Sequence, residues 1–219
     1  MTGSGQDCDA LVIGGGPAGL MAAEALLDAG RAVTLAEAKP SVGRKFLMAG
    51  KSGLNLTKIE DAAAFLAAFG AAAPRFAPML EAFGPDAVRD WAEALDQPVF
   101  TGSTGRLFPT VMKASPLLRA WLARLERKGL RRRTGWRWTG WDAARAVFDT
   151  PGGGVALAPS VTVLALGGGS WARLGSDGQW AGILARDGVP VVPFAPANAA
   201  IAVPWSAHMR SHFGKPLKG

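Results

Sequence analysis

The chain has 219 residues, of which 49% are hydrophobic and 19% charged, a balance that excludes an intrinsically disordered protein and allows a large α/β domain. Its formal net charge of +7 favours anionic partners such as nucleotides, nucleic acid or membrane surfaces, without choosing among them. The single cysteine, Cys8, excludes an intrachain disulfide, a paired-cysteine metal site and a redox-active cysteine pair.

The first predicted unit is a strand, a turn, a helix and a second strand. The short apolar run Ala10–Ile13 predicts the first strand, and Pro17–Ala29 predicts an amphipathic helix with proline in its first turn and Gly30 after its end. The run Ala32–Ala36 predicts the second strand, which ends at Glu37. This βαβ order predicts an α/β fold with a Rossmann-like, dinucleotide-binding domain.

The glycines between the first strand and its helix form a GxGxxG pattern, which has meaning only in this context. Gly14 permits a tight turn, Gly16 lets the backbone approach a pyrophosphate, and Gly19 lets the helix pack against the strand. The helix N-terminus adds unpaired N–H groups and a partial positive charge. The predicted phosphate-binding turn comprises Gly14, Gly15, Gly16, Pro17, Ala18 and Gly19.

An acidic residue at the end of the second strand strengthens this interpretation. Glu37 follows Gly19 by 18 residues, where a carboxylate accepts hydrogen bonds from ribose hydroxyls and repels a 2′-phosphate. The pattern therefore disfavours NADP at this site and leaves FAD and NAD open, with Glu37 and Ala38 as cofactor-binding candidates. The alternative is a set of turn glycines beside a surface glutamate.

Further along the chain, residues 40–57 contain three glycines and predict a long functional loop with little regular structure. Apolar periodicity predicts helices over 59–69, 84–95 and 115–128, and the alanine-rich stretch 62–73 is also predicted to be helical.

Loose alternation over 130–149 predicts paired strands, and 161–166 predicts a buried strand closed by Gly167–Gly169. A helix is predicted over 177–186. Prolines interrupt the uncharged stretch 188–209 four times, so it is no membrane-spanning helix, and the first ten residues do not resemble a signal peptide. We expect a cytoplasmic protein with no membrane partner and a domain boundary after Val189.

Several motifs together resemble a known family. The segment GGGPAGLMAAEAL with Glu37 looks like the first motif of flavoproteins that bind two dinucleotides. GRKFLMAGKSGLNLT at 43–57 is similar to the GRK-apolar-apolar-SGGGRCNxT segment of the HI0933-like (BaiN-type, aminoacetone-oxidase-like) FAD-dependent flavoproteins. GSTGRLFP at 102–109, MKASPLL at 112–118 and the three glycines after Leu166 match that family as well, so the resemblance runs over essentially the whole chain.

The resemblance implies further cofactor-binding residues beyond the first turn. It places Arg44 and Lys45 near the FAD ribose and pyrophosphate, and Asn55 towards the flavin. Cations suit a diphosphate, although a solvated basic loop is the alternative. The other residues that it assigns to FAD are Ser52, Gly167 and Gly168, the last two of which could also be an ordinary glycine turn.

The chain departs from the family at two positions. Lys51 and Leu54 stand where many members have glycine and cysteine, so chemistry that needs that cysteine is absent. Lys51 is the best candidate for a cation near the flavin. No catalytic acid or base can be named.

The resemblance also implies a domain organisation. Residues 1–190 correspond to the FAD-binding domain and 191–219 to the start of a β-rich inserted domain, after which longer members return to complete the FAD site. On this expectation the chain is a truncated oxidoreductase with NAD(P)H as candidate electron donor. It would bind FAD weakly, would be inactive alone and would expose Ile201, Val203, Trp205 and Phe213.

Two other functions compete with this one. The basic segment, defined as Arg124–Arg137, precedes Trp138 and Trp141 and could serve an RNA-associated flavoprotein or a nucleic-acid-binding module. A helix end followed by a strand would scatter these cations over several faces, so a solvated edge is the favoured interpretation. A non-catalytic nucleotide-binding remnant is the other alternative. His208 and His212 have no acidic neighbour that would complete a metal site, and no metal is expected.

Overall fold

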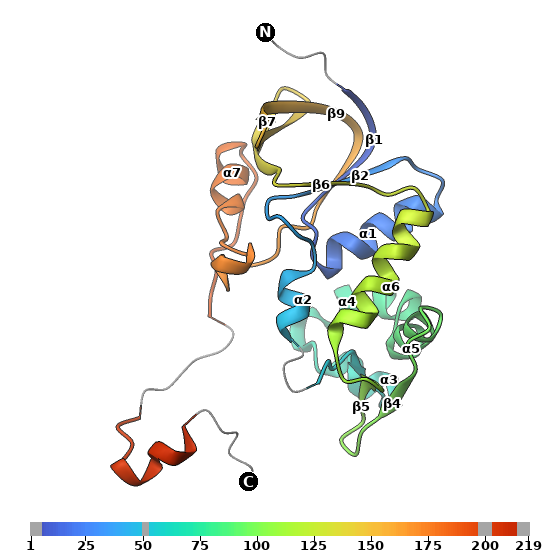
Figure 1. Ribbon diagram of the computed structural model, residues 1–219, viewed down its shortest axis with the longest axis vertical. Helices are drawn as coiled ribbons and strands as arrows, with labels where there is room; N and C mark the ends of the chain where they lie inside the picture. Colours follow the sequence, from blue (N-terminus) through green and yellow to red (C-terminus); the bar gives the residue numbers. More distant parts are fainter. Residues whose placement is uncertain (1–5, 50–52, 197–202, 214–219) are drawn as a thin grey trace.

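The computed structural model describes residues 6–49, 53–196 and 203–213 (Figure 1). Its strands are β1 (Gln6–Ile13), β2 (Val33–Glu37), β3 (Thr57–Lys58), β4 (Val99–Thr101), β5 (Arg106–Pro109), β6 (Arg131–Thr134), β7 (Arg137–Asp142), β8 (Arg145–Thr150) and β9 (Gly153–Leu164). Its α-helices are α1 (Pro17–Asp28), α2 (Arg44–Ala49), α3 (Ala62–Ala67), α4 (Ala73–Ala82), α5 (Pro85–Glu93), α6 (Ala114–Arg127) and α7 (Trp180–Arg186).

The main sheet has six strands in the order β6-β2-β1-β9-β8-β7. Its β6, β2, β1 and β9 run parallel, whereas β9, β8 and β7 form an antiparallel meander. Ile13 pairs with Ala36 on one side and with Leu164 on the other, so the three central parallel strands end at the same edge. The α/β Rossmann-type fold and its βαβ unit are therefore confirmed.

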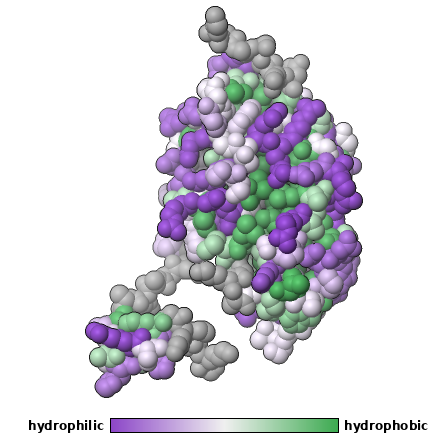
Figure 2. Space-filling view, in the orientation of Figure 1, coloured by the Kyte–Doolittle hydropathy of each residue, from purple (hydrophilic) through white to green (hydrophobic). Residues whose placement is uncertain are grey.

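Two hydrophobic cores cover the two faces of this sheet. Alternate β1 residues such as Val12 pack with α1 and α6 on one face, where Trp121 is the largest buried side chain. Leu11 and Ile13 face the other side, where they pack with Phe148 of the meander and with α7. Figure 2 shows hydrophilic side chains over much of the visible surface, around a hydrophobic area near its middle. The alternation of side chains along β1 explains how one strand serves both cores.

A smaller unit lies between α2 and α6 in the sequence. It contains α3, α4 and α5 with a three-stranded antiparallel sheet in the order β3-β5-β4. Figure 1 shows it at the end of the molecule opposite the meander. Its helix α5 contributes Ala92 to the core that α1 and α6 share.

Most predicted helices are confirmed with shorter bounds, but two predictions were wrong. The predicted loop at 40–57 contains α2, because Leu47 N–H donates to Gly43 O at 2.9 Å and Phe46 packs against the core. The alanine-rich stretch is not one helix, since the chain turns at Gly70 with φ +54° and restarts as α4. Helix α4 was not predicted, because Pro78 inside it is a helix-breaking signal.

The predicted strands all belong to the main sheet and differ from the observed ones in detail, whereas β3, β4 and β5 of the smaller sheet were not predicted. Strands β7 and β8 pair antiparallel as expected, but β6 leaves that group and pairs parallel with β2. Strand β9 begins at Gly153, well before the predicted residue 161, and its last part is only half-buried, with Val161 37% exposed. Tertiary contacts with β1 extend the strand beyond its apolar run.

The predicted second domain at 191–219 remains a prediction. Residues 203–213 contain the 3₁₀-helix η3 (Ala207–His212) and leave Val203, Trp205 and Phe213 exposed, while Ile201 lies outside the described residues. Across the described ranges, no helix has the length and apolar character needed to cross a bilayer.

A buried carboxylate joins the two helices that cover one face of the sheet. Glu24 of α1 is 6% exposed and accepts a hydrogen bond from Trp121 Nε1 at 2.6 Å. Its Oε1 pairs with Arg124 at 3.3 Å and Lys128 at 3.2 Å. Although burial lowers the pKa of Lys128, its hydrogen bonds with Asp28 and Glu24 raise that pKa above its ordinary value, so Lys128 stays charged at neutral pH.

We expect Glu24→Gln to lower the free energy of unfolding by about 2 kcal/mol, because hydrogen bonds to a charged, buried acceptor are lost. Asp28→Asn is the matched control: Asp28 also pairs with Lys128 but is exposed, and its loss is expected to lower the free energy by less than about 1 kcal/mol. Urea unfolding of both variants measures the difference. Equal effects would contradict the structural role given to Glu24.

Candidate functional site

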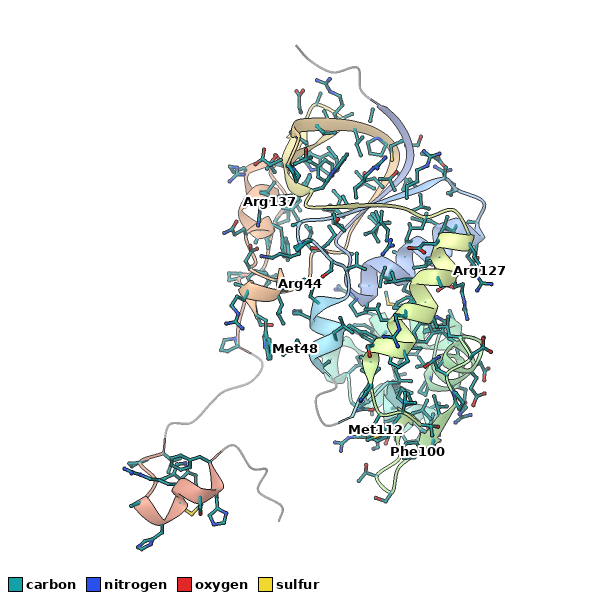
Figure 3. The ribbon with its side chains drawn as sticks, viewed as in Figure 1. Arg44, Met48, Phe100, Met112, Arg127 and Arg137 are labelled. Carbon is teal, nitrogen blue, oxygen red and sulfur yellow. The ribbon has the colours of Figure 1, made fainter. Side chains whose placement is uncertain are left out.

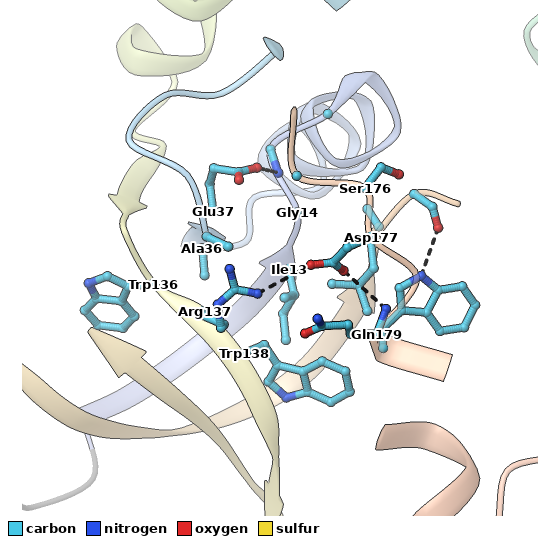
Figure 4. A pocket seen from close by; sticks show the side chains of 18 of the residues that line it. Ile13, Gly14, Ala36, Glu37, Trp136, Arg137, Trp138, Ser176, Asp177 and Gln179 are labelled. Atoms are coloured by element: carbon cyan, nitrogen blue, oxygen red, sulfur yellow. Dashed lines mark hydrogen bonds and ion pairs between the residues drawn. The ribbon is translucent and has the colours of Figure 1, made fainter. Parts of the chain in front are cut away.

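A cavity of about 440 Å³ lies at the edge where β1, β2 and β9 end (Figure 4). The first turn and the start of α1 form one wall, and Trp136–Thr139 at the start of β7 form another. Residues 165–167 after β9 and 174–186 around α7 complete it. Parallel strands of an open α/β sheet place their ligand sites at this edge.

The first glycine turn, Gly14–Gly19, has the geometry that its pattern predicts. Gly14 has φ +111°, and a Cβ there would meet Ala165 O at 2.2 Å. A Cβ on Gly19 would lie 1.8 Å from Gly14 O, so the helix packs directly on the turn. At Gly16 a Cβ would have no neighbour within 4 Å. Two glycines are therefore required by packing, whereas Gly16 leaves space beside the helix N-terminus.

The carboxylate of Glu37 lies at this turn. Its Oε2 accepts a hydrogen bond from Gly15 N–H at 2.8 Å, and its Oε1 accepts one from Lys39 N–H at 2.8 Å. A carboxylate has about four acceptor positions, so two remain for a ligand. The acid at the end of β2 and the turn after β1 thus form one site.

Two cations predicted from the 43–57 segment also line the cavity. Arg44 and Lys45 occupy the first turn of α2. Lys45 Nζ donates to Ser170 O at 3.5 Å, and the buried Nε of Arg44 has no partner among the described residues. Both residues therefore line the same cavity as the glycine turn.

Residues around α7 complete the cavity, and no motif in the sequence marks them. Arg137 and Asp177 approach each other across it, with a 3.7 Å separation between Nη1 and Oδ2 (Figure 4). Trp180 Nε1 donates to Gly167 O at 3.0 Å, and Ser176 Oγ donates to Gly168 O at 2.7 Å. The one available signal was the pair Gly175 and Gly178, which both have positive φ and frame this turn.

The predicted site residues divide into three groups. Those that line the cavity are Gly14, Gly15, Gly16, Pro17, Ala18, Glu37, Ala38, Arg44, Lys45 and Gly167. Gly19 lies behind the turn, and Gly168 borders the cavity through its contact with Ser176. Asn55 is exposed and does not line the cavity, while Lys51 and Ser52 lie outside the described residues.

The basic segment divides its side chains among different partners. Arg124 pairs with Glu24, Arg132 pairs with Glu126, and Arg133 lies over the Trp136 ring at 5.9 Å. In Figure 3, Arg127 at the end of α6 and Arg137 beside the cavity lie on opposite sides of the molecule. The segment therefore has no single cationic face, which agrees with a solvated edge.

Comparison with known proteins identifies the fold independently. A family model described as "HI0933-like protein Rossmann domain" matches residues 8–202. No protein with a curated description matches the sequence.

Solved structures share the fold at low sequence identity. An open conformation of a flavocytochrome c3 fumarate reductase matches with a TM-score of 0.61 and 22% identity, over 76% of this chain and 34% of that chain. A 3-ketosteroid-delta4-(5alpha)-dehydrogenase from Rhodococcus jostii RHA1 matches with a TM-score of 0.57 and 16% identity, over 75% and 47%. For THI4 from Thermovibrio ammonificans the TM-score is 0.53 and the identity 14%, over 84% and 64%. The chain thus spans about a third to two thirds of these proteins.

Proposed function

The chain belongs to the HI0933-like Rossmann-domain family, and on that premise we propose that its cavity binds FAD for an oxidoreductase reaction. The observation that carries the proposal is the position of Glu37 at the first glycine turn, inside one cavity. The Glu37 carboxylate offers hydrogen-bond acceptors for a ribose, and the glycine turn with the N-terminus of α1 offers a binding site for a pyrophosphate. FAD would supply hydride and electron transfer, and the chain would bind and orient it.

In this proposal the ADP half of FAD lies across the ends of β2 and β1. The pyrophosphate lies beside Gly16 at the N-terminus of α1, where the open space and the unpaired N–H groups suit an anion. Arg44 and Lys45 add positive charge on the α2 side. Glu37 uses its remaining lone pairs for the ribose hydroxyls and repels a 2′-phosphate.

The proposal also includes an electron donor for the flavin. NAD(P)H is the candidate electron donor, because flavins accept hydride from it. No residue of the cavity is assigned as a catalytic acid or base, and the substrate class is left open.

We expect Glu37→Ala to weaken ADP and FAD binding about tenfold to a hundredfold, because a half-buried, charged acceptor for the ribose is lost. The same variant should lose discrimination against 2′-phosphorylated ADP, since the repelling charge is gone. Isothermal titration with ADP, 2′-phospho-ADP and FAD measures both effects. Glu81→Ala, on the exposed surface of α4, is the control and should bind like the parent. Parent-like affinities in Glu37→Ala would contradict the ribose assignment.

A further inference from the structure

Of three consecutive glycines after β9, two accept a hydrogen bond from a side chain further along the chain, and the third lies beside the Phe194 ring. We call Gly167–Gly169 the second glycine turn. Trp180 Nε1 donates to Gly167 O at 3.0 Å, and Ser176 Oγ donates to Gly168 O at 2.7 Å. A Cβ on Gly169 would lie 3.4 Å from the Phe194 ring. The 176–194 segment therefore holds two carbonyls of this turn and lies against its last glycine.

These contacts are built into the packing. Ser176 is one of the few buried polar residues, 4% exposed, and its Oγ would lie 2.6 Å from a Cβ on Gly167, which has φ +73°. The Trp180 and Phe194 rings meet edge to face with centroids 5.5 Å apart. Because a trans peptide directs its N–H opposite to its C=O, the two hydrogen bonds also fix the N–H directions of Gly168 and Gly169.

The sheet order places this second glycine turn next to the first. Glu37 ends β2, Gly14 follows β1, and Gly167 follows β9, and these strands are neighbours in the order β2-β1-β9. A dinucleotide with its ribose at Glu37 and its pyrophosphate at the first glycine turn therefore extends towards the second. The part beyond the pyrophosphate is absent from ADP and present in FAD.

From these contacts we infer that Ser176 and Trp180 are positioning residues that hold the second glycine turn for the flavin-bearing half of FAD. The inference rests on the proposed function. Neither side chain acts on the reacting atoms: each removes an alternative conformation of the turn before the ligand binds. Such preorganisation raises affinity because less order must be created on binding.

The test uses Ser176→Ala and Trp180→Phe, which each remove one hydrogen bond to a different carbonyl. We expect each to weaken FAD binding about tenfold, the effect of about 1.4 kcal/mol, and to leave ADP binding within twofold of the parent. Titration of each variant with FAD and with ADP gives the ratio of the loss in FAD affinity to the loss in ADP affinity. A general loosening of the fold would lower both affinities by the same factor, so the ratio separates positioning from stability.

Trp91→Phe is the matched control. Trp91 also meets an aromatic ring edge to face, that of Trp121, and its Nε1 has no partner among the described residues, so the substitution removes no hydrogen bond. Unchanged FAD binding in Ser176→Ala and Trp180→Phe, or equal losses for FAD and ADP, would overturn the inference. So would a parent that binds FAD no more tightly than ADP. A parent that binds neither ligand would instead contradict the proposed function, and this inference with it.

Discussion

Gly19→Ala is expected to destabilise the native fold by more than about 3 kcal/mol, the upper range for overpacking a close contact. The new Cβ would lie 1.8 Å from Gly14 O and 3.3 Å from Ala165 Cβ. Neither neighbour is the end of a flexible side chain, so α1 would have to move away from β1. Since small domains are stable by only about 5 to 15 kcal/mol, a large part of the total is lost.

Circular dichroism during thermal and urea unfolding measures this loss. Gly182→Ala in α7 is the control, because it makes the same substitution in a helix where a Cβ has no neighbour within 4 Å. It should be neutral or stabilising, since alanine is the better helix former. Native-like stability of Gly19→Ala would show that α1 does not pack on the turn as described.

Gly16→Val is expected to keep the fold and to weaken ADP and FAD binding by more than about a hundredfold. Gly16 has φ −80° and ψ −179°, an extended conformation that valine adopts readily, and a Cβ there has open space around it. The branched side chain would occupy the space proposed for the pyrophosphate and hold it away from the N–H groups of α1.

The measurement pairs ligand titration with a circular dichroism spectrum of the same sample. A folded Gly16→Val variant with parent-like affinity would mean that the pyrophosphate lies elsewhere. Gly19→Ala and Gly16→Val thus separate two uses of glycine in one motif, packing in the first case and ligand access in the second.

Local signals explain why the βαβ unit could be predicted from the sequence. The signals are a short apolar run, a proline in the first helical turn and Glu37 at a fixed spacing from the glycines. They all lie within about 40 residues of one another in the sequence. The structure places Gly14, Gly16 and Glu37 as that pattern requires.

The far wall of the cavity could not be predicted in the same way. Arg137 meets Asp177 because the β7-β8-β9 meander returns its first strand to face α7. Trp180 meets Gly167 because the chain turns back between β9 and α7. Neither side chain belongs to a motif of its own. Long-range packing also explains why α2 was not predicted. Its Phe46 packs against the core between α1 and α6, and nothing in the glycine-rich sequence of residues 40–57 indicates that contact.

The 43–57 segment shows the limit of motif resemblance. Arg44 and Lys45 of this segment line the cavity, but Asn55 is exposed beside the buried Leu54. A motif identifies which residues recur in a family, whereas the direction of each side chain depends on the packing of its neighbour.

The most direct test of the central claim is equilibrium titration of the 219-residue chain with FAD, followed by flavin fluorescence and repeated with Gly16→Val. We expect saturable binding at one FAD per chain, competition by ADP, and loss of binding in Gly16→Val. No saturable binding to the parent, or binding that Gly16→Val retains, would contradict a dinucleotide site in the cavity at the ends of β1, β2 and β9.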